Sequence, residues 1–333
     1  MPEHVQPDPA PFFCSPILMP KVWGGRRLAR WGKTLPEGVQ VGESWEVADL
    51  TSTSPTGGGG QGVHSTIGSG PLHGATLHDA VAVWGARLLG TTPPGPGGAF
   101  PLLVKYLDAR EHLSVQVHPS PEYARAHPEA HLKTETWYVL DAEEIDGTSP
   151  VIFKGLLPGV GEADLRRHIE QGTVPQVLRA VPAVPGSCHT LPSGTIHALG
   201  AGVLVAEVQT PSDTTFRVYD WAREYGRTGR SLHIEESLAC ICYDQPPEAT
   251  VCPPGGASCR LAETPYFAID ERIGAASLSG GRDAAAVLMV IDGHGALAGN
   301  PSMALKRGDT VIVPAACGCA WQGDVRVLVV RVG

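Results

Sequence analysis

The stretch Leu113-Ser-Val-Gln-Val-His-Pro119 carries most of the information in this chain, together with Lys133-Thr-Glu-Thr-Trp137 a hairpin's length later. Successive side chains of a β-strand point to opposite faces of the sheet. If the first stretch is a strand, Gln116 and His118 lie on one of its faces. If the second stretch is a strand, Lys133 and Glu135 likewise lie on one of its faces. The sequence therefore predicts two short strands that bring an amide, an imidazole, an ammonium and a carboxylate to one wall of a β structure.

A third stretch, Leu191-Pro-Ser-Gly-Thr-Ile-His-Ala-Leu-Gly200, supplies a second histidine directly after a turn. His118, Glu135 and His197 then offer two imidazoles and one carboxylate. Such a set, with an open coordination position, suits a catalytic divalent metal ion such as zinc or iron. A lone histidine is more often structural than a ligand, but a carboxylate on the same buried face is costly unless a metal or another cation compensates its charge. We therefore predict a metal centre.

The composition favours a mainly β protein. The chain has 333 residues, among them 41 glycines and 30 prolines. These two residue types make up about a fifth of the chain, which indicates many turns between short strands. Hydrophobic residues account for 42% of the chain, enough for a substantial core. Because the length exceeds that of a usual single domain, we expect two domains or one elaborated domain.

Charge and hydropathy exclude several kinds of partner. The net charge of −9 argues against nucleic acids and anionic membranes, which need a basic face on the protein. No apolar run approaches the roughly 18 residues that span a bilayer. Residues 1–9 lack the basic and apolar parts of a signal peptide, so we expect a cytoplasmic protein. The eight cysteines do not indicate a disulfide framework, and we expect the pairs Cys240/Cys242 and Cys317/Cys319 to be small buried residues.

Hydrophobic periodicity divides the chain into predicted elements. Apolar residues recur at helical spacing in three segments, 72–89, 162–171 and 232–242. Residues 51–70, which contain four consecutive glycines, indicate a flexible loop. The double proline within residues 245–247 marks the predicted boundary between a first domain, residues 1–244, and a second, residues 245–333.

Several motifs resemble those of a known family. Four stretches resemble signature blocks of type I mannose-6-phosphate isomerase, a zinc-dependent cupin enzyme, in its short bacterial form: Val115-Gln-Val-His-Pro119, Lys133-Thr-Glu-Thr-Trp-Tyr138, Pro192-Ser-Gly-Thr-Ile-His-Ala-Leu-Gly200 and Ser212-Asp-Thr-Thr-Phe-Arg-Val-Tyr-Asp-Trp221. Further agreement lies upstream, in Lys21-Val-Trp-Gly-Gly25, Gly42-Glu-Ser-Trp-Glu46 and Phe100-Pro-Leu-Leu-Val-Lys-Tyr-Leu-Asp-Ala109. The blocks keep the family's order from about residue 15 to residue 235.

The resemblance implies a fold of two cupin-like (jelly-roll) β-barrels, with a few helical segments inserted in or flanking the first. The run Lys306-Arg-Gly-Asp-Thr-Val-Ile-Val-Pro-Ala315 has the shape of a cupin strand pair, as does the run that begins at Pro185. The second barrel lacks the histidine and glutamate ligands, and we expect His294 and Asp309 in it to be solvated turn residues. His189, in a strand that is aromatic-rich in the family, is expected near the rim of the first barrel.

The resemblance also implies one Zn²⁺ per chain, held by Gln116, His118, Glu135 and His197. Gln116 is the least typical zinc ligand of the four. Its alternative role is a hydrogen bond that orients another ligand.

Arg217 matches the family's active-site arginine. Aldose–ketose isomerisation passes through an enediolate, and a fixed guanidinium stabilises the charge that develops on its oxygens. The alternative role of Arg217 is an ion pair with Asp213 or Asp220. The proton must be moved by a base, for which Glu207 and Lys133 are both candidates.

The substrate is expected to be a phosphorylated hexose, and Lys105, Arg110 or Lys133 could bind its phosphate. The resemblance thus implies an isomerase that interconverts mannose 6-phosphate and fructose 6-phosphate. Two alternatives remain from the residues alone: a cupin dioxygenase with a two-histidine, one-glutamate iron site, and a non-catalytic sugar-binding cupin. We expect a monomer or a small homo-oligomer.

Overall fold

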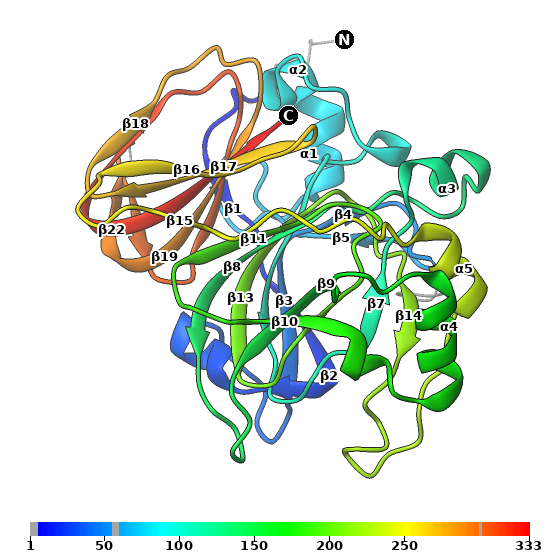
Figure 1. Cartoon of the computed structure of the whole chain (residues 1–333). Coiled ribbons are helices and arrows are strands. Elements are labelled where there is room, and N and C mark those ends of the chain that lie inside the picture. Colours follow the sequence, from blue (N-terminus) through cyan, green and yellow to red (C-terminus); the bar gives the residue numbers. More distant parts are fainter. Residues whose placement is uncertain (1–5, 55–59, 300–301) are drawn as a thin grey trace.

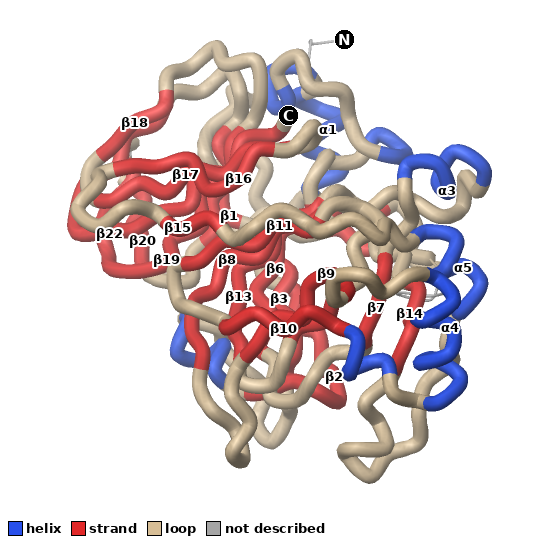
Figure 2. The backbone as a smooth tube through the Cα atoms, viewed as in Figure 1, coloured by secondary structure: helices blue, strands red, loops and turns tan. Residues whose placement is uncertain are grey.

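Strands dominate the structure, a computed structural model that describes residues 6–54, 60–299 and 302–333. Within these residues the strands form four sheets, and the helices lie at the margins (Figures 1 and 2). The expectation of a mainly β protein is therefore confirmed. None of the helices in the described parts of the chain is both long and apolar enough to cross a membrane.

A seven-stranded antiparallel sheet forms the centre of the molecule. Its strands, in spatial order, are β15 (Thr250–Val251), β11 (Ser187–Leu191), β8 (Glu135–Ala142), β13 (Val203–Gln209), β6 (Leu103–Asp108), β3 (Val41–Val47) and β2 (Ile17–Gly25). Strand β13 is buried along its whole length. Its two faces pack into different hydrophobic clusters, since Val203 and Val205 belong to one and Leu204 and Ala206 to another.

A five-stranded sheet packs with one face of this central sheet. Its strands, in spatial order, are β10 (Leu178–Pro182), β9 (Val151–Leu156), β12 (His197–Leu199), β7 (Val115–Val117) and β14 (Phe216–Tyr219). Ile152 and Leu199 of this sheet contact Trp137 and Val139 of the central sheet in a shared hydrophobic cluster. The side chains between the two sheets include every predicted metal ligand.

The C-terminal part of the chain forms the largest sheet. Its strands are β21 (Thr310–Val313), β19 (Ala286–Leu297), β22 (Cys319–Val332), β17 (Phe267–Ile273) and β16 (Ser258–Glu263) in spatial order, with β18 (Ala276–Leu278) on β22 and β20 (Met303–Lys306) on β19. The two parts of the chain exchange edge strands. β1 (Phe12–Phe13) pairs with β21, whereas β15, which follows the predicted boundary, pairs with β11 of the central sheet. One continuous core contains residues of both parts.

The helices and remaining strands complete the fold. They are α1 (Leu77–Trp84), α2 (Ala86–Leu89), α3 (Pro121–Ala126), α4 (Glu162–Gln171), α5 (Ile234–Cys240), the short 3₁₀ helices Arg27–Trp31, Pro96–Gly98 and Val174–Val177, and the two-stranded sheet of β4 (Asp49–Leu50) and β5 (Val63–His64). The predicted helix 162–171 is confirmed to the residue. It ends where Gly172 adopts a left-handed conformation with φ of 68°, which glycine tolerates best.

Two predictions of local structure need correction. The helix expected over 72–89 starts only at Leu77, because Thr76 and Asp79 form a capping box there, and it breaks at Gly85 into α1 and α2. The glycine-rich loop 51–70 contains strand β5, which pairs with β4. Residues 55–59 of that loop, which include three of its four consecutive glycines, lie outside the described residues.

The structure also tests what was expected of the cysteines and of His189. Cys252 and Cys259 form a disulfide, a single short bridge rather than a framework. Cys240 and Cys319 are buried as expected, whereas Cys242 is exposed. His189 is buried inside strand β11 and not at a rim, and its Nε2 lies 2.9 Å from the hydroxyl of Ser187.

Replacing Phe12 by alanine should lower the free energy of unfolding by about 3–5 kcal/mol, the usual cost of removing a buried aromatic side chain. The side chain is 0% exposed, and its ring centroid lies 5.8 Å from that of Trp84. Urea denaturation measures the change. The matched control is Val22→Ala, since Val22 is 59% exposed. An equally small effect for both variants would mean that β1 does not secure the C-terminal sheet.

Candidate active site and metal centre

Strand register brings the predicted site residues together. In an antiparallel sheet, directly paired residues point to the same face. In the central sheet Glu207 pairs with Trp137 on one side and with Lys105 on the other. In the five-stranded sheet Gln116 pairs with both His197 and Arg217. The paired residues therefore form one row of side chains across each sheet, although they are up to about a hundred positions apart in the sequence.

The closest cluster consists of His118, Glu135 and His197. The Nε2 atom of His118 lies 3.3 Å from one carboxylate oxygen of Glu135, and Nε2 of His197 lies 3.1 Å from the other. The Nδ1 atoms of the two rings face backbone carbonyls, of Thr214 at 3.0 Å and of Thr195 at 2.8 Å. A carbonyl oxygen needs a proton donor, so Nδ1 carries a proton on each ring, and Nε2 is the atom of each ring that is directed at the carboxylate and can bind a metal.

The burial of this cluster fits a metal cation. Glu135 is 0% exposed, and neither of its oxygens accepts a hydrogen bond of normal geometry from the described residues. Burial raises the pKa of Glu135, but the neighbouring charge of Lys133 outweighs it and holds the pKa well below its usual range. Burial, aided by Lys133, lowers the pKa of His118 to about 3. One carboxylate and two imidazoles that present Nε2 are a donor set for zinc-class ions.

Lys133 and Gln116 flank the cluster. The ammonium of Lys133 lies 2.7 Å from Glu135 and 3.1 Å from Nε2 of His118. The side-chain amide of Gln116 lies 3.2 Å from Nε2 of His197. If the amide group is rotated by 180°, its oxygen takes the place of its nitrogen near Nε2 of His197. The geometry is therefore compatible with either role predicted for Gln116, a ligand or a group that orients His197.

A second group of buried charges lies along the row of Glu207. The ammonium of Lys105 is 3.1 Å from Glu207 and 3.7 Å from Glu43, and the indole N–H of Trp137 donates to Glu207 at 2.9 Å. Burial raises the pKa of Glu207 despite the opposing charge of Lys105. Burial also raises the pKa of Glu43, but Lys105 and Lys21 bring it down to about 2. The two carboxylates therefore differ: Glu43 stays ionised, while Glu207 is closer to accepting a proton.

Arg217 occupies the edge of the five-stranded sheet. Its Nη1 donates to the carbonyl of Ser231 at 2.7 Å. Burial, and then the charge of Arg230, lower the pKa of the guanidinium to about 10. Asp220, one of the acids considered as a partner for Arg217, pairs instead with Arg230 at 2.9 Å.

A cavity of about 200 Å³ connects these groups. Its walls combine three tryptophans, three carboxylates and several cations: Trp23, Trp45, Trp137, Glu43, Glu207, Asp213, Lys21, Lys105, Lys133, Arg217 and Arg230. Gln116 also lines it, so the metal cluster adjoins its wall. Lys21, Glu43 and Arg230 were not predicted as site residues, although the first two lie in the upstream sequence blocks.

The structure separates one predicted residue from the rest. Arg110 is exposed and lines a different surface depression, with Arg27 and Asp108. Strand β6 ends at Asp108, and the backbone N–H of Arg110 donates to the carbonyl of Trp23 in the turn that follows. The prediction that Arg110 binds phosphate therefore has no support from the geometry.

A larger cavity, of about 460 Å³, lies elsewhere and offers less chemistry. It is lined mainly by prolines and small residues, with Tyr266 and His131 among them, and its lining includes no aspartate, glutamate, lysine or arginine side chain from the described residues. A phosphorylated substrate needs cations, and isomerisation needs a base. The smaller, charged cavity, which adjoins the metal cluster, is therefore the candidate active site.

The sequence and structure have clear relatives. A family model described as the catalytic domain of type I phosphomannose isomerase matches residues 21–147. Mannose-6-phosphate isomerase ManA of Bacillus subtilis is 33% identical over 319 residues, which cover 92% of this chain and 94% of that protein. The chain belongs to the type I phosphomannose isomerase family. The crystal structure of the Bacillus subtilis mannose 6-phosphate isomerase superposes with a TM-score of 0.81 at 30% identity, over 97% of this chain and 99% of that one.

A more distant phosphomannose isomerase shares the fold. It is a mannose 6-phosphate isomerase structure bound with zinc and yttrium, which superposes with a TM-score of 0.71 at 19% identity, over 97% of this chain and all of that one.

Replacing His118 or His197 by alanine should remove one metal ion per chain and abolish turnover, because two remaining donors cannot hold an ion in an open site. Metal analysis of the purified proteins measures the loss. His189→Asn is the control, since His189 is a buried histidine of the central sheet that lies outside the cluster. Gln116→Ala should be milder if Gln116 only orients His197. A metal-replete, active His118→Ala protein would contradict the assignment.

Proposed function

We propose that this protein interconverts mannose 6-phosphate and fructose 6-phosphate, an aldose–ketose isomerisation. The proposal rests on one observation: a candidate metal cluster, the buried carboxylate of Glu207 with its raised pKa, and several cations all lie at one cavity. Membership of the phosphomannose isomerase family supports it, and favours it over an iron dioxygenase or a non-catalytic sugar-binding protein. An oxygenase has no need of guanidinium groups facing an enediolate.

The metal is proposed to be one Zn²⁺ in this centre, held by His118, Glu135 and His197, with Gln116 as a fourth ligand or as a neighbour that orients His197. The zinc found in a structure of the same fold supports this choice, as does the donor set. When bound, the ion supplies Lewis-acid polarisation of the substrate's oxygen atoms. Lys133 contacts Glu135 and His118, so we propose that its charge tunes these ligands as well as facing the substrate.

Proton transfer is proposed to belong to Glu207 rather than to Lys133. Glu207 lines the cavity, has a raised pKa and is held in place by the indole N–H of Trp137. A base works best when its pKa approaches the working pH. Lys105 is fully buried and already paired with Glu207 and Glu43, so we propose that it positions the base instead of binding phosphate.

The phosphate is proposed to bind near the two guanidinium groups. Arg217 and Arg230 both line the cavity, and their mutual repulsion contributes to the lowered pKa of Arg217. Two like charges in one wall are favourable when an anion lies between them. Arg217 then has a second role, stabilising the negative oxygens of the enediolate. Lys21, whose side chain is partly exposed, adds a cation to the same cavity.

We also propose that the two facing sheets of residues 1–244 form one cupin-like barrel and that residues 245–333 form a second, which holds no metal. The position of the metal cluster between two sheets supports the first part. In the C-terminal sheet His294 is exposed, and Asp309 accepts a hydrogen bond from the backbone of Lys306 in a turn, which supports the second. The oligomeric state and the cytoplasmic location stay predictions.

Arg217→Lys should lower kcat about a hundredfold, roughly 3 kcal/mol in the barrier, while the metal content stays unchanged. Lysine keeps the charge but loses the planar set of donors. Steady-state kinetics measures the effect. Arg110→Ala is the control and should leave kcat and KM unchanged, because Arg110 lies outside the cavity. If Arg217→Lys raises only KM, Arg217 binds phosphate and has no role at the enediolate.

The pH profile should identify the base. Only the carboxylate form of Glu207 accepts a proton, so turnover should fall as the pH drops through its pKa, which lies above the 4.5 of a free glutamate. Glu207→Gln should remove this acid limb and lower kcat by about 10²–10⁴-fold. Trp137→Phe removes an N–H that stabilises the carboxylate, so the limb should move to higher pH. An acid limb that survives in Glu207→Gln would assign the base to Lys133.

A further inference from the structure

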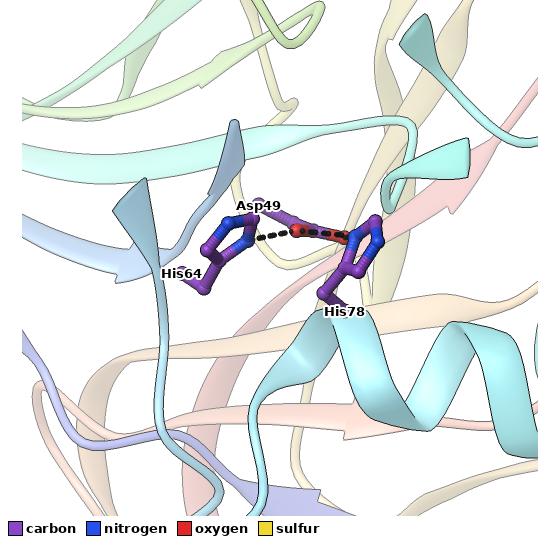
Figure 3. Close-up of side chains that lie close together, drawn as sticks. All are labelled: Asp49, His64 and His78. Carbon is purple, nitrogen blue, oxygen red and sulfur yellow. Dashed lines mark hydrogen bonds and ion pairs between the residues drawn. The ribbon is translucent and has the colours of Figure 1, made fainter. Parts of the chain in front are cut away.

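A second cluster of metal-binding side chains lies outside the active site. It consists of Asp49 in β4, His64 in β5 and His78 in α1, and none of the three lines the substrate cavity. The Nδ1 atom of His64 lies 2.6 Å from Oδ1 of Asp49. The Nδ1 atom of His78 lies 3.2 Å from the same oxygen and 3.4 Å from the other. Figure 3 shows the two rings on either side of the carboxylate.

The carboxylate is buried, whereas the rings reach the surface. Asp49 is 0% exposed, and the side chains of His64 and His78 are 29% and 36% exposed. Asp49 forms no ion pair with a lysine or arginine among the described residues; the ionisable side chains beside it are the two imidazole rings. Its Oδ2 accepts the backbone N–H of Phe100 at 2.7 Å. A buried carboxylate needs a compensating cation, and one hydrogen bond to a backbone N–H is the usual way in which a ligating carboxylate is oriented.

The backbone fixes the three residues before any ion binds. Asp49 and His64 are directly paired in the β4–β5 sheet, so their side chains share one face. Ser65, the neighbour of His64, donates its backbone N–H to Ala48 at 2.7 Å and accepts the N–H of Leu77 at 2.8 Å. Ala48 precedes Asp49 and Leu77 precedes His78. One buried serine therefore ties together the chain neighbours of all three side chains.

The helix start adds to this rigidity. His78 lies in the first turn of α1, which the capping box of Thr76 and Asp79 holds in place. A preorganised set of this kind costs little ordering entropy when an ion binds. The three ligand atoms lie within 4.8 Å of one another, close enough to coordinate one ion.

We propose that Asp49, His64 and His78 bind a second divalent transition-metal ion of the zinc class, separate from the catalytic ion. Two imidazole nitrogens and one carboxylate oxygen favour zinc, nickel, copper or cobalt over magnesium and calcium, which prefer oxygen ligands. The exposed edges of the rings leave the remaining coordination positions to water. The ion joins the β4–β5 sheet to the start of α1 and balances the charge of Asp49, so its role is to hold these elements together.

The competing explanation is that hydrogen bonds alone hold the three side chains together. Each Nδ1–H can donate to the carboxylate at the same distances, with no metal present. The two explanations differ in metal stoichiometry, because only the first gives the full chain two metal-binding sites. The catalytic centre has to be removed separately so that one site is not mistaken for the other.

The test is a titration of the metal-free full-length protein with Co²⁺, whose visible spectrum reports nitrogen and oxygen ligands, and with Zn²⁺ in competition. The wild type should bind two ions per chain, and His64→Ala and His78→Ala should each bind one. His118→Ala should keep one ion, and His118→Ala combined with His78→Ala should bind none. His73→Ala, which removes an exposed histidine from the same segment, should still bind two.

Two further measurements keep the outcome interpretable. His78→Gln retains an N–H that can donate to Asp49 but is a poor ligand, so it should keep the fold and still lose one ion. Isomerase turnover of the zinc-loaded His78→Gln protein should stay within about twofold of wild type, since the variant leaves the catalytic ligands intact. The proposal is overturned if the wild type binds a single ion, or if His64→Ala and His78→Gln bind as many ions as the wild type. Loss of turnover in His118→Ala bears on the catalytic centre alone.

Discussion

Two carboxylates buried between the facing sheets, Glu135 and Glu207, constrain the structure around them. A carboxylate without compensation in such a place would cost several kcal/mol. The protein therefore sets Lys133 against Glu135 and Lys105 against Glu207, and the opposite sheet contributes imidazoles. These same groups are the ones that can bind a metal, move a proton and face an anion. Stability and chemistry depend on one set of charges.

The rigidity of the site follows from where these charges are attached. Glu207 stands on β13, a strand buried along its whole length. On the other face of that strand, Leu204, Ala206 and Val208 pack into the core that the central and C-terminal sheets share. A side chain on a central strand that is packed on both faces has little freedom to move, which suits the role proposed for Glu207. The C-terminal sheet thus supports the active site although it contributes no residue to the cavity.

Features set by neighbouring residues were predictable from the sequence, and features set by distant ones were not. The alternation of Gln116 with its neighbours and the helical spacing of residues 162–171 are local signals, and both predictions were confirmed. The position of Lys105 beside Glu207 depends on the register between β6 and β13, which no single stretch specifies. For the same reason sequence reasoning missed Arg230, and it named Arg110 as one residue that could bind phosphate, although Arg110 lines a different surface depression.

The exchange of edge strands has a consequence for biosynthesis. Phe12 pairs with Ile312, so the first strand of the chain emerges long before its partner exists. At the usual rates of about 5–20 residues per second, the interval is on the order of 15–60 seconds. During this time β1 has no partner strand, and once the C-terminal sheet forms, its β21 edge stays open until β1 docks. An open edge can pair with other chains. The pairing of β1 with β21 therefore has to wait until almost 300 further residues have been synthesised.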